Sequence, residues 1–206
     1  MRNLIPTTRS ADEEDDHEEK PAAVAVPIVR RLLETRTVLV CGPVSDDMGR
    51  DVMAQLLVLD AQDAAKPIRV VINSPGGSVD AGYAIYDVMR FVKAPVYSIC
   101  AGLAASAATV ILLGAPKEHR YALPNTRFLI HQPSTGIQGQ ASDVVIGAQE
   151  ILKLRRKVNE LLARETGNTI ERIAEDTRRD YWMSAEEART YGLITTVLEH
   201  AADLPA

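Results

Sequence analysis

Short apolar runs alternate with amphipathic segments along the first half of this chain. The runs at 37–44 and 68–73 predict buried strands, and the second continues into the turn sequence SPGGS. After each run the apolar positions take the spacing of a helix, which we expect over 48–59 and 79–91. A repeated order of strand, turn and helix predicts βαβ units with right-handed crossovers, and therefore an α/β fold.

The second half continues this alternation and contains one uncharged segment, residues 94–116. Its length would suit a transmembrane helix, but its proline, glycine and serine residues favour a strand, a glycine turn and a buried helix. Periodicity and helix caps predict four further elements. These are short strands at 120–124 and 127–131, an amphipathic helix over roughly 142–165, and a last helix that opens with the capping-box pair Ser184 and Glu187 and closes at Gly192.

Composition is typical of a soluble globular protein. The 206 residues, 46% of them apolar and 25% charged, suffice for one domain with a full core. Seven acids crowd the stretch from Asp12 to Glu19 without an apolar run before them, which favours a mobile tail over a signal or transit peptide. We therefore expect an acidic segment over 1–23, a folded domain over 24–200, a tail over 201–206, and a cytoplasmic location.

Charge and ligand residues argue against several classes of function. The net charge of −5, without a cluster of lysine and arginine, argues against nucleic-acid binding. Cys41 and Cys100 lie in apolar runs, where cysteine acts as a small hydrophobic residue rather than as a disulfide or metal ligand. The histidines at 17, 119, 131 and 200 are too scattered for a local metal site. We expect no metal and no cofactor.

Candidate chemistry centres on Ser106, which lies among small residues in AGLAASAAT. A serine in such a segment is commonly a packing residue, but His131 at the end of RFLIH and Asp180 in DTRRDYW could supply a base and an orienting carboxylate. Glu175 and Asp176 are alternatives to Asp180. The chain order Ser, His, Asp and the lack of GxSxG differ from α/β-hydrolases, which indicates another serine-hydrolase scaffold.

The glycine-rich turn SPGGS could bind an anion through its backbone amides. It lacks GxGxxG and GxxxxGK[ST], so nucleotide binding is disfavoured. An oxyanion hole needs only two amides, and we expect them from Gly77 and from Ala107, the residue after the candidate nucleophile. A tight turn required only by the topology is the structural alternative.

Five blocks of this sequence together resemble the Clp protease proteolytic-subunit family of serine peptidases. They occur in the family's order across roughly residues 37–198. The blocks are INSPGGSVDAGYAIYDVM at 72–89, CAGLAAS at 100–106, YALPNTRFLIHQP at 121–133, GIQGQASDVVIGAQEIL at 136–152, and DTRRDYWMSAEEARTYGLI at 176–194.

The resemblance implies a spiral of βαβ units, shared with crotonases, that carries a protruding strand-helix handle. It assigns Ser106 as nucleophile, His131 as base, Asp180 rather than Asp176 as orienting acid, and the amides of Gly77 and Ala107 as the oxyanion hole. It further implies a homo-oligomeric barrel of two stacked heptameric rings, alone or mixed with a companion subunit. Unfolded polypeptides would be delivered by a separate AAA+ ATPase, since this chain has no P-loop.

The chain departs from the family at a few positions. Ala107 replaces the usual methionine after the nucleophile, which changes the adjacent pocket but keeps the backbone donor. Arg69 and Val71 replace aromatic residues of the cleft that docks the ATPase, whereas Phe91 matches one of them. A non-catalytic or regulatory subunit of a mixed barrel and a crotonase-type acyl-CoA enzyme are the alternative functions.

Overall fold

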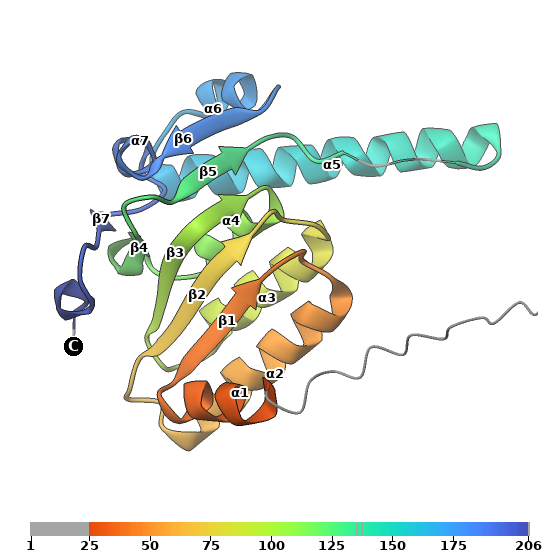
Figure 1. Cartoon of the computed structure of the whole chain (residues 1–206). Coiled ribbons are helices and arrows are strands. Elements are labelled where there is room, and N and C mark those ends of the chain that lie inside the picture. Colours follow the sequence, from red (N-terminus) through yellow and green to blue (C-terminus); the bar gives the residue numbers. More distant parts are fainter. Residues whose placement is uncertain (1–24, 135, 137, 206) are drawn as a thin grey trace, which may run out of the picture.

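A mostly parallel β-sheet organises the residues that the structure, a computed structural model, describes: 25–134, 136 and 138–205. Its strands follow the order β1-β2-β3-β4-β7, while β5 pairs with the C-terminal part of β3 and β6 pairs with β5 (Figure 1). The elements, in chain order, are α1 Ala25–Glu34, β1 Thr37–Cys41, α2 Asp46–Gln62, β2 Ile68–Ser74, α3 Val79–Phe91, β3 Val96–Ala105, α4 Ala107–Leu112, η1 Lys117–His119, β4 Arg120–Ala122, β5 Arg127–Ile130, α5 Ala141–Thr166, α6 Ile170–Asp176, β6 Tyr181–Ser184, α7 Ala185–Tyr191, β7 Thr196–Val197 and η2 Ala201–Asp203.

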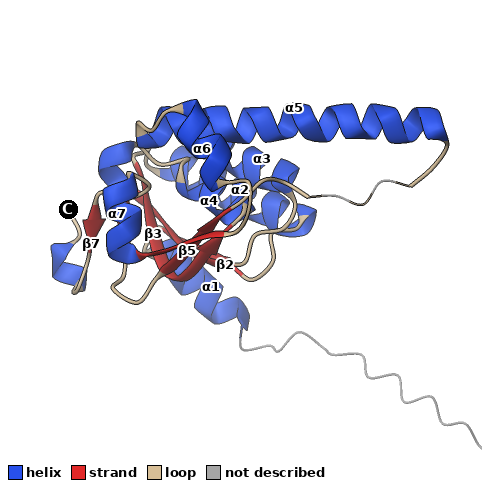
Figure 2. Cartoon of the chain, turned by 90° about the horizontal axis from the view of Figure 1, so that it is seen from above, coloured by secondary structure: helices blue, strands red, loops and turns tan. Residues whose placement is uncertain are grey.

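Helices α2, α3 and α4 lie along one face of this sheet (Figures 1 and 2). Alternate residues of β1 and β2, such as Val38 and Val70, are completely buried and join the core that these helices share. Since β1, β2 and β3 pair in parallel, the intervening helices form the predicted βαβ crossovers. The α/β fold expected from the sequence is therefore confirmed.

The uncharged segment 94–116 folds as β3 and α4 rather than as one long helix. Gly102, with φ of 85°, lies where β3 changes partner from β4 to β5. A residue with a side chain would be strained in this conformation, so the glycine permits the change of partner. Within the described ranges, no helix has the length and apolar content needed to cross a membrane.

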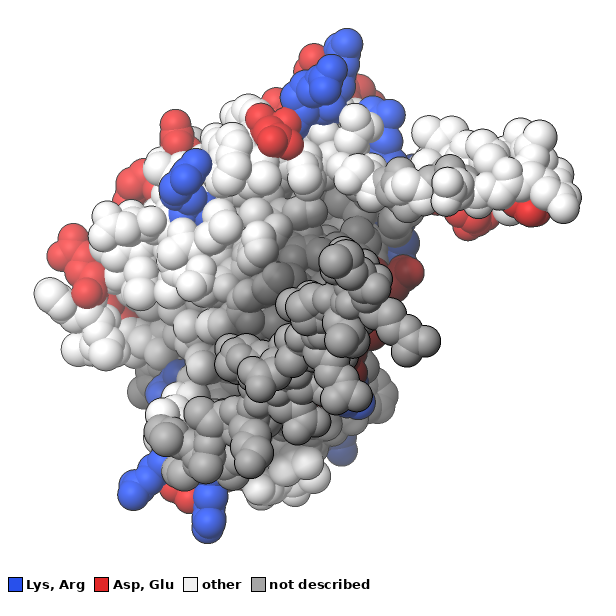
Figure 3. Space-filling model, turned by 45° about the vertical axis from the view of Figure 1, so that its right-hand side comes forward, with Lys and Arg blue, Asp and Glu red and all other residues white. Residues whose placement is uncertain are grey.

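Helix α5 projects far beyond the sheet (Figure 1). Its C-terminal half is anchored in the core by residues such as Leu161 and Leu162, whereas Val144 and Val145 are exposed near its start. Figure 3 shows that the surface of this projecting end is largely uncharged. The helix begins one residue before the predicted Ser142, and Gln140 occupies the N-cap without a side-chain capping bond.

The strand expected in the handle is not formed by the described residues between β5 and α5, which are 131–134, 136 and 138–140. The described part of the handle is therefore helical and consists of the projecting part of α5. The predicted acidic segment over 1–23 lies outside the described residues.

The two cysteines, which their apolar runs led us to expect as small hydrophobic residues, differ in environment. Cys100 lies on the central strand β3 and is fully buried, and burial raises the pKa of its thiol. Cys41 is exposed at the end of β1. Leu39 is exposed on the same face of β1, opposite the buried Val38 and Val40, so this apolar run is buried on one face only.

A buried arginine, which the sequence patterns do not indicate, ties the end of α5 to the centre of the fold. Arg120 is completely buried, and its guanidinium donates to the carbonyls of Ala115, Leu113 and Glu165 and to the Glu165 carboxylate. Burial alone would raise the pKa of Glu165, but hydrogen bonds from Arg120 and Arg164 outweigh this and hold it below its usual value. The pair therefore stays ionised at neutral pH.

Replacing Glu165 by alanine is expected to lower the free energy of unfolding by about 3 kcal/mol at pH 7, because it leaves a buried charge unpaired. The folded-state pKa of Glu165 lies below its ordinary value of 4.5, so the carboxylate stabilises the fold above pH 4.5 and loses this effect as the pH falls further. Denaturant unfolding at several pH values measures both effects. Glu175→Ala, which removes an exposed ion pair with Arg178, should cost less than about 1 kcal/mol. If both variants lost the same free energy of unfolding, the buried ion pair would stabilise the fold no more than the exposed one.

Candidate active site

Ser106 occupies a strained turn between β3 and α4. Its φ of 54° and ψ of −121° are unusual for a residue with a side chain and cost on the order of 1–3 kcal/mol. Neighbouring elements hold the conformation: the Ser106 amide donates to the Leu129 carbonyl of β5 at 2.9 Å, and the Ser106 carbonyl accepts from both the amide and the hydroxyl of Thr109. The strain thus presents the hydroxyl at the carboxyl end of a parallel strand, where α/β proteins place their sites.

His131 reaches Ser106 because β5 runs parallel to the end of β3. Ala105 pairs with Leu129, so the chain leaves the sheet at His131 immediately beside the turn that carries Ser106. Both residues line one small cavity. In the described part of the chain no hydrogen bond joins Ser106 Oγ to the imidazole. Such bonds are often long in ligand-free enzymes and tighten when substrate binds.

Asp180 is brought to His131 by the antiparallel pairing of β5 and β6. Ile130 pairs with Tyr181, so the residues just beyond this pair, His131 and Asp180, are also cross-strand neighbours. His131 Nδ1 and Asp180 Oδ1 are 2.9 Å apart. An ionised carboxylate can only accept a hydrogen bond, so Nδ1 is the protonated nitrogen and Nε2 is free to accept a proton.

The two other acids near Asp180 have different partners. Asp176 accepts a hydrogen bond from the Tyr191 hydroxyl at 2.7 Å. Glu175 forms an exposed ion pair with Arg178. Neither of these acids has a hydrogen bond to His131 among the described residues. The structure therefore singles out Asp180 from the three acids that the sequence left open.

The turn at Gly76 and Gly77 lies directly against the Ser106 turn. A Cβ on Gly76 would come within 2.5 Å of the Ala105 carbonyl and 2.9 Å of the Ala107 nitrogen, so only glycine permits this approach. On its other side the turn is held by Val44, whose amide donates to the Gly76 carbonyl at 2.9 Å. Gly76 and Val44 were not singled out from the sequence, which pointed only to the glycine-rich turn as a whole.

The two amides expected to form the oxyanion hole, those of Gly77 and Ala107, belong to the turns that meet at Ser106. Ala107 is the first residue of α4, so its amide has no acceptor within the helix. Gly77 is exposed and lines a groove, while the bonds that fix its turn use the neighbouring Gly76 carbonyl and Ser78 amide. The structure thus brings together all five residues predicted from the sequence: Ser106, His131, Asp180, Gly77 and Ala107.

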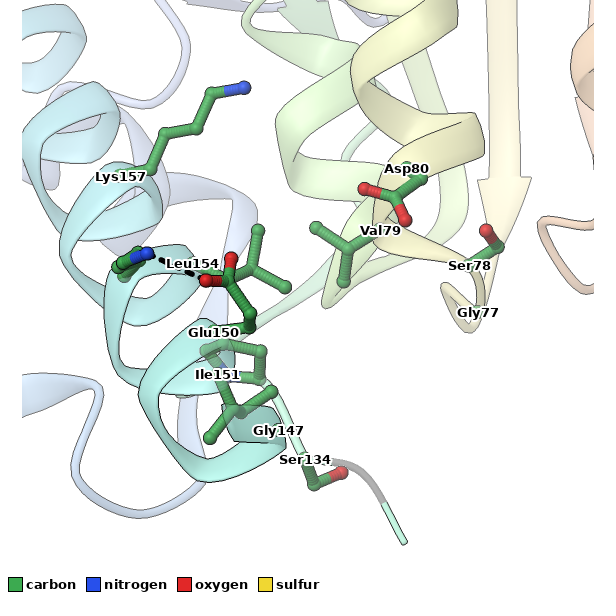
Figure 4. A pocket seen from close by; sticks show the side chains of 12 residues that line it. Gly77, Ser78, Val79, Asp80, Ser134, Gly147, Glu150, Ile151, Leu154 and Lys157 are labelled. Carbon is green, nitrogen blue, oxygen red and sulfur yellow. Dashed lines mark hydrogen bonds and ion pairs between the residues drawn. The ribbon is translucent and has the colours of Figure 1, made fainter. Parts of the chain in front are cut away.

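Two cavities adjoin these residues. The larger is an open groove of about 620 Å³ between the start of α3 and helix α5, and Gly77 lies at its edge (Figure 4). The smaller, of about 10 Å³, lies beside Ser106, Ala107 and His131 and extends toward α5. In the part of the chain that the structure describes, no three His, Cys, Asp or Glu side chains gather in a way that could hold a metal ion.

Of the three positions named for the ATPase-docking cleft, Phe91 is exposed, whereas Arg69 and Val71 are half-buried. Phe91 is 80% exposed at the end of α3, and Leu57 and Val58 are exposed apolar residues on α2. Arg69 is half-buried on β2, and its Nε is buried without a hydrogen-bond partner among the described residues. These residues form no part of the site around Ser106.

Comparison with known proteins gives consistent results. The Clp protease family matches residues 19–201. The chain is 50% identical over 176 residues to the ATP-dependent Clp protease proteolytic subunit 2 of Treponema pallidum (strain Nichols), covering 85% of this chain and 88% of that protein. It is 45% identical over 178 residues to the protein of the same name from Treponema denticola, covering 86% and 89%. The chain therefore belongs to the Clp protease family.

Proposed function

We propose that this chain is a serine endopeptidase in which Ser106 is the nucleophile, His131 the general base and Asp180 the residue that orients the base. The observation that carries the proposal is the hydrogen bond between His131 and Asp180 beside the strained turn of Ser106. Family membership supports peptidase chemistry and disfavours the crotonase alternative.

The proposed reaction proceeds through an acyl-enzyme. Ser106 Oγ forms a bond to the peptide carbonyl carbon while its proton passes to His131 Nε2. The carbonyl oxygen becomes negatively charged and is stabilised by the amides of Gly77 and Ala107. The C–N bond then breaks, and the leaving amine takes the proton from the imidazolium. Water, deprotonated by the same histidine, hydrolyses the ester and restores the Ser106 hydroxyl.

We further propose that the chain works inside a barrel of two stacked heptameric rings in the cytoplasm, alone or with a companion subunit. The Treponema relatives are named ATP-dependent proteolytic subunits, and this chain has no P-loop. ATP would therefore be used by an AAA+ partner that delivers unfolded polypeptides, and the chain itself would need no cofactor. The projecting helix α5, with its exposed apolar residues, suits contact between the rings.

A fluorophosphonate probe tests the proposed nucleophile. The wild-type protein should form one covalent adduct, located at Ser106 by mass spectrometry, because the probe phosphonylates a serine whose proton a neighbouring base removes. Ser106→Ala should take up no label, whereas Ser142→Ala, a change on the exposed part of α5, should label like the wild type. Labelling that persists in Ser106→Ala would overturn the assignment. A wild-type protein that stays unlabelled even with its ATPase would favour the non-catalytic subunit.

A further inference from the structure

The face of the sheet opposite α2, α3 and α4 carries a second, smaller group of apolar residues. Tyr97 on β3, Tyr121 on β4 and Leu198 after β7 are buried there. The partly buried side chains of Ile99 and Leu204 pack against them. None of these five residues belongs to the main core of the described chain, which lies on the other face of the same strands. We call the five residues the aromatic cluster.

The aromatic cluster lies on the face that carries two of the expected docking positions. In the parallel pairing of β2 and β3, Arg69 stands opposite Tyr97 and Val71 stands opposite Ile99. Tyr121 is the next neighbour of Ile99, on β4. Paired residues of neighbouring strands present their side chains on the same face of a sheet. The cluster therefore continues the surface that the family resemblance assigns to docking of the ATPase.

The aromatic side chains of this surface are covered in the free chain. The two docking positions that the resemblance gives as aromatic are occupied by Arg69 and Val71. Tyr97 and Tyr121 supply aromatic rings on the adjacent strands instead, but they are only 6% and 3% exposed. Tyr97 also stacks against His119, with ring centroids 4.3 Å apart. An apolar side chain of a partner can therefore reach these rings only after their cover has moved.

The C-terminal segment supplies part of this cover. The Leu198 amide donates to the Ala122 carbonyl at 2.8 Å, which continues the pairing of β7 with β4. The chain then turns through η2 at the edge of the sheet (Figure 1). After this turn Leu204 packs against the aromatic cluster. The chain thus leaves the cluster at Leu198 and returns to it six residues later.

A single carboxylate holds the turn between these two leucines. Asp203 Oδ2 accepts hydrogen bonds from the His200 amide at 2.8 Å and from the Glu199 amide at 3.2 Å. Both bonds lie at exposed positions, where water competes for the same groups. Leu204 contributes only one partly buried side chain. A segment with so few buried contacts opens at a small cost in free energy.

We propose that residues 199–205 form an autoinhibitory strap, which an apolar side chain of the ATPase displaces from the aromatic cluster. In the free protein the strap covers the rings because Asp203 closes the turn and Leu204 packs on the cluster. The affinity for the ATPase is then reduced by the fraction of molecules in which the strap is open. This inference rests on the proposed partnership with an AAA+ ATPase and adds a regulatory contact to it.

The test uses the complete oligomeric protein and two probes: the apolar dye anilinonaphthalene sulfonate, and the AAA+ ATPase that stimulates degradation of unfolded casein. Asp203→Ala and Leu204→Ala should each raise the fluorescence of bound dye. Each should also lower the Kd of the ATPase by about 3- to 10-fold, the range expected when a partly buried leucine no longer covers the cluster. Leu204→Met keeps an apolar side chain of similar volume and should behave like the wild type.

Glu199→Ala is the matched control for Asp203→Ala. It removes an acid of the same charge from the same segment, and within the described ranges the Glu199 carboxylate has no hydrogen bond or ion pair. Three results would overturn the inference: unchanged dye fluorescence and ATPase affinity in both strap variants, an equal gain in Glu199→Ala, or weaker ATPase binding in Leu204→Ala. The last result would make Leu204 part of the docking surface itself.

Failure of the proposed function has a different signature. In that case the wild-type protein takes up no fluorophosphonate at Ser106, and no AAA+ ATPase stimulates it. The dye still reports whether Asp203 and Leu204 keep the aromatic cluster covered, because its binding depends on exposed apolar surface and not on catalysis.

Discussion

Replacing Ser106 by alanine lowers kcat for peptide hydrolysis by on the order of 10⁶-fold, His131→Ala lowers it by a similar factor, and combining the two changes adds almost nothing. This result is expected because the hydroxyl and the imidazole act as one unit: without the base the hydroxyl is a weak nucleophile, and without the hydroxyl the base has no proton to accept. Hydrolysis of a quenched peptide, measured by single-turnover kinetics at saturating enzyme, gives each value.

His200→Ala serves as the control for loss of an imidazole, since His200 is an exposed residue near the C-terminus. Its kcat should stay within about twofold of the wild type, as expected for a surface change away from the site. Additive losses in the double variant would show that Ser106 and His131 act independently. They would also contradict the shared proton transfer that the adjacent positions of these residues suggest.

The amides of Gly77 and Ala107 should supply the activity that remains in these variants. They belong to the backbone, so replacing the nucleophile or the base does not remove them. Their placement depends on Gly76, because any side chain there would collide with the Ala105 carbonyl. Two separate βα turns, one after β2 and one after β3, are thus held in contact by a single residue that carries no reactive group.

Sequence patterns correctly predicted those elements whose structure depends only on residues within the same short segment. Helix α3 has the predicted bounds, 79–91, because a strand, a Gly-Gly turn and a serine cap define its start. The capping box of Ser184 and Glu187 is present, and Gly192 ends α7 in the left-handed conformation. These features depend on neighbours within a few residues, which sequence patterns record directly.

Features that depend on tertiary contacts were not predictable in the same way. The short elements α6, β6 and β7 lack a long periodic pattern, and their form depends on the elements they pack against. The burial of Arg120 depends on acceptors from two separate segments, the loop after α4 and the end of α5. The exposure of Cys41 follows from its position on the face of β1 that points away from the core. Composition alone carries none of this information.

In the active site, the acid that contacts His131 is the clearest example of a feature that local sequence could not predict. Glu175, Asp176 and Asp180 lie within one short acidic stretch, and local sequence gives each a similar chance of contacting a histidine far away in the chain. The antiparallel register of β5 and β6 decides the matter, since it places Asp180 opposite His131. Register is set by pairing over the whole strand. The family resemblance had already favoured Asp180, because it rests on matching motif positions and not on the local chemistry of the three acids.

Replacing Asp180 by asparagine should therefore lower kcat by about 10³- to 10⁴-fold. The asparagine amide can donate to Nδ1, which would move the proton to Nε2 and remove the lone pair that Ser106 needs. Asp180 is largely exposed in the single chain, with 62% of its side chain accessible, so water screens its charge and the lower end of this range is expected. Fluorophosphonate labelling should become slow but still occur at Ser106.

Asp176→Asn provides the matched control, because it makes the same chemical change four residues earlier. It weakens the hydrogen bond from Tyr191 and should cost about 1 kcal/mol of stability while leaving kcat within about threefold of the wild type. The pH dependence of kcat/KM separates the two effects, since only a residue that holds the imidazole should change the acidic limb of activity, along which protonation removes the base. If Asp176→Asn lost activity as severely as Asp180→Asn, the contact between His131 and Asp180 would not be the one that supports catalysis.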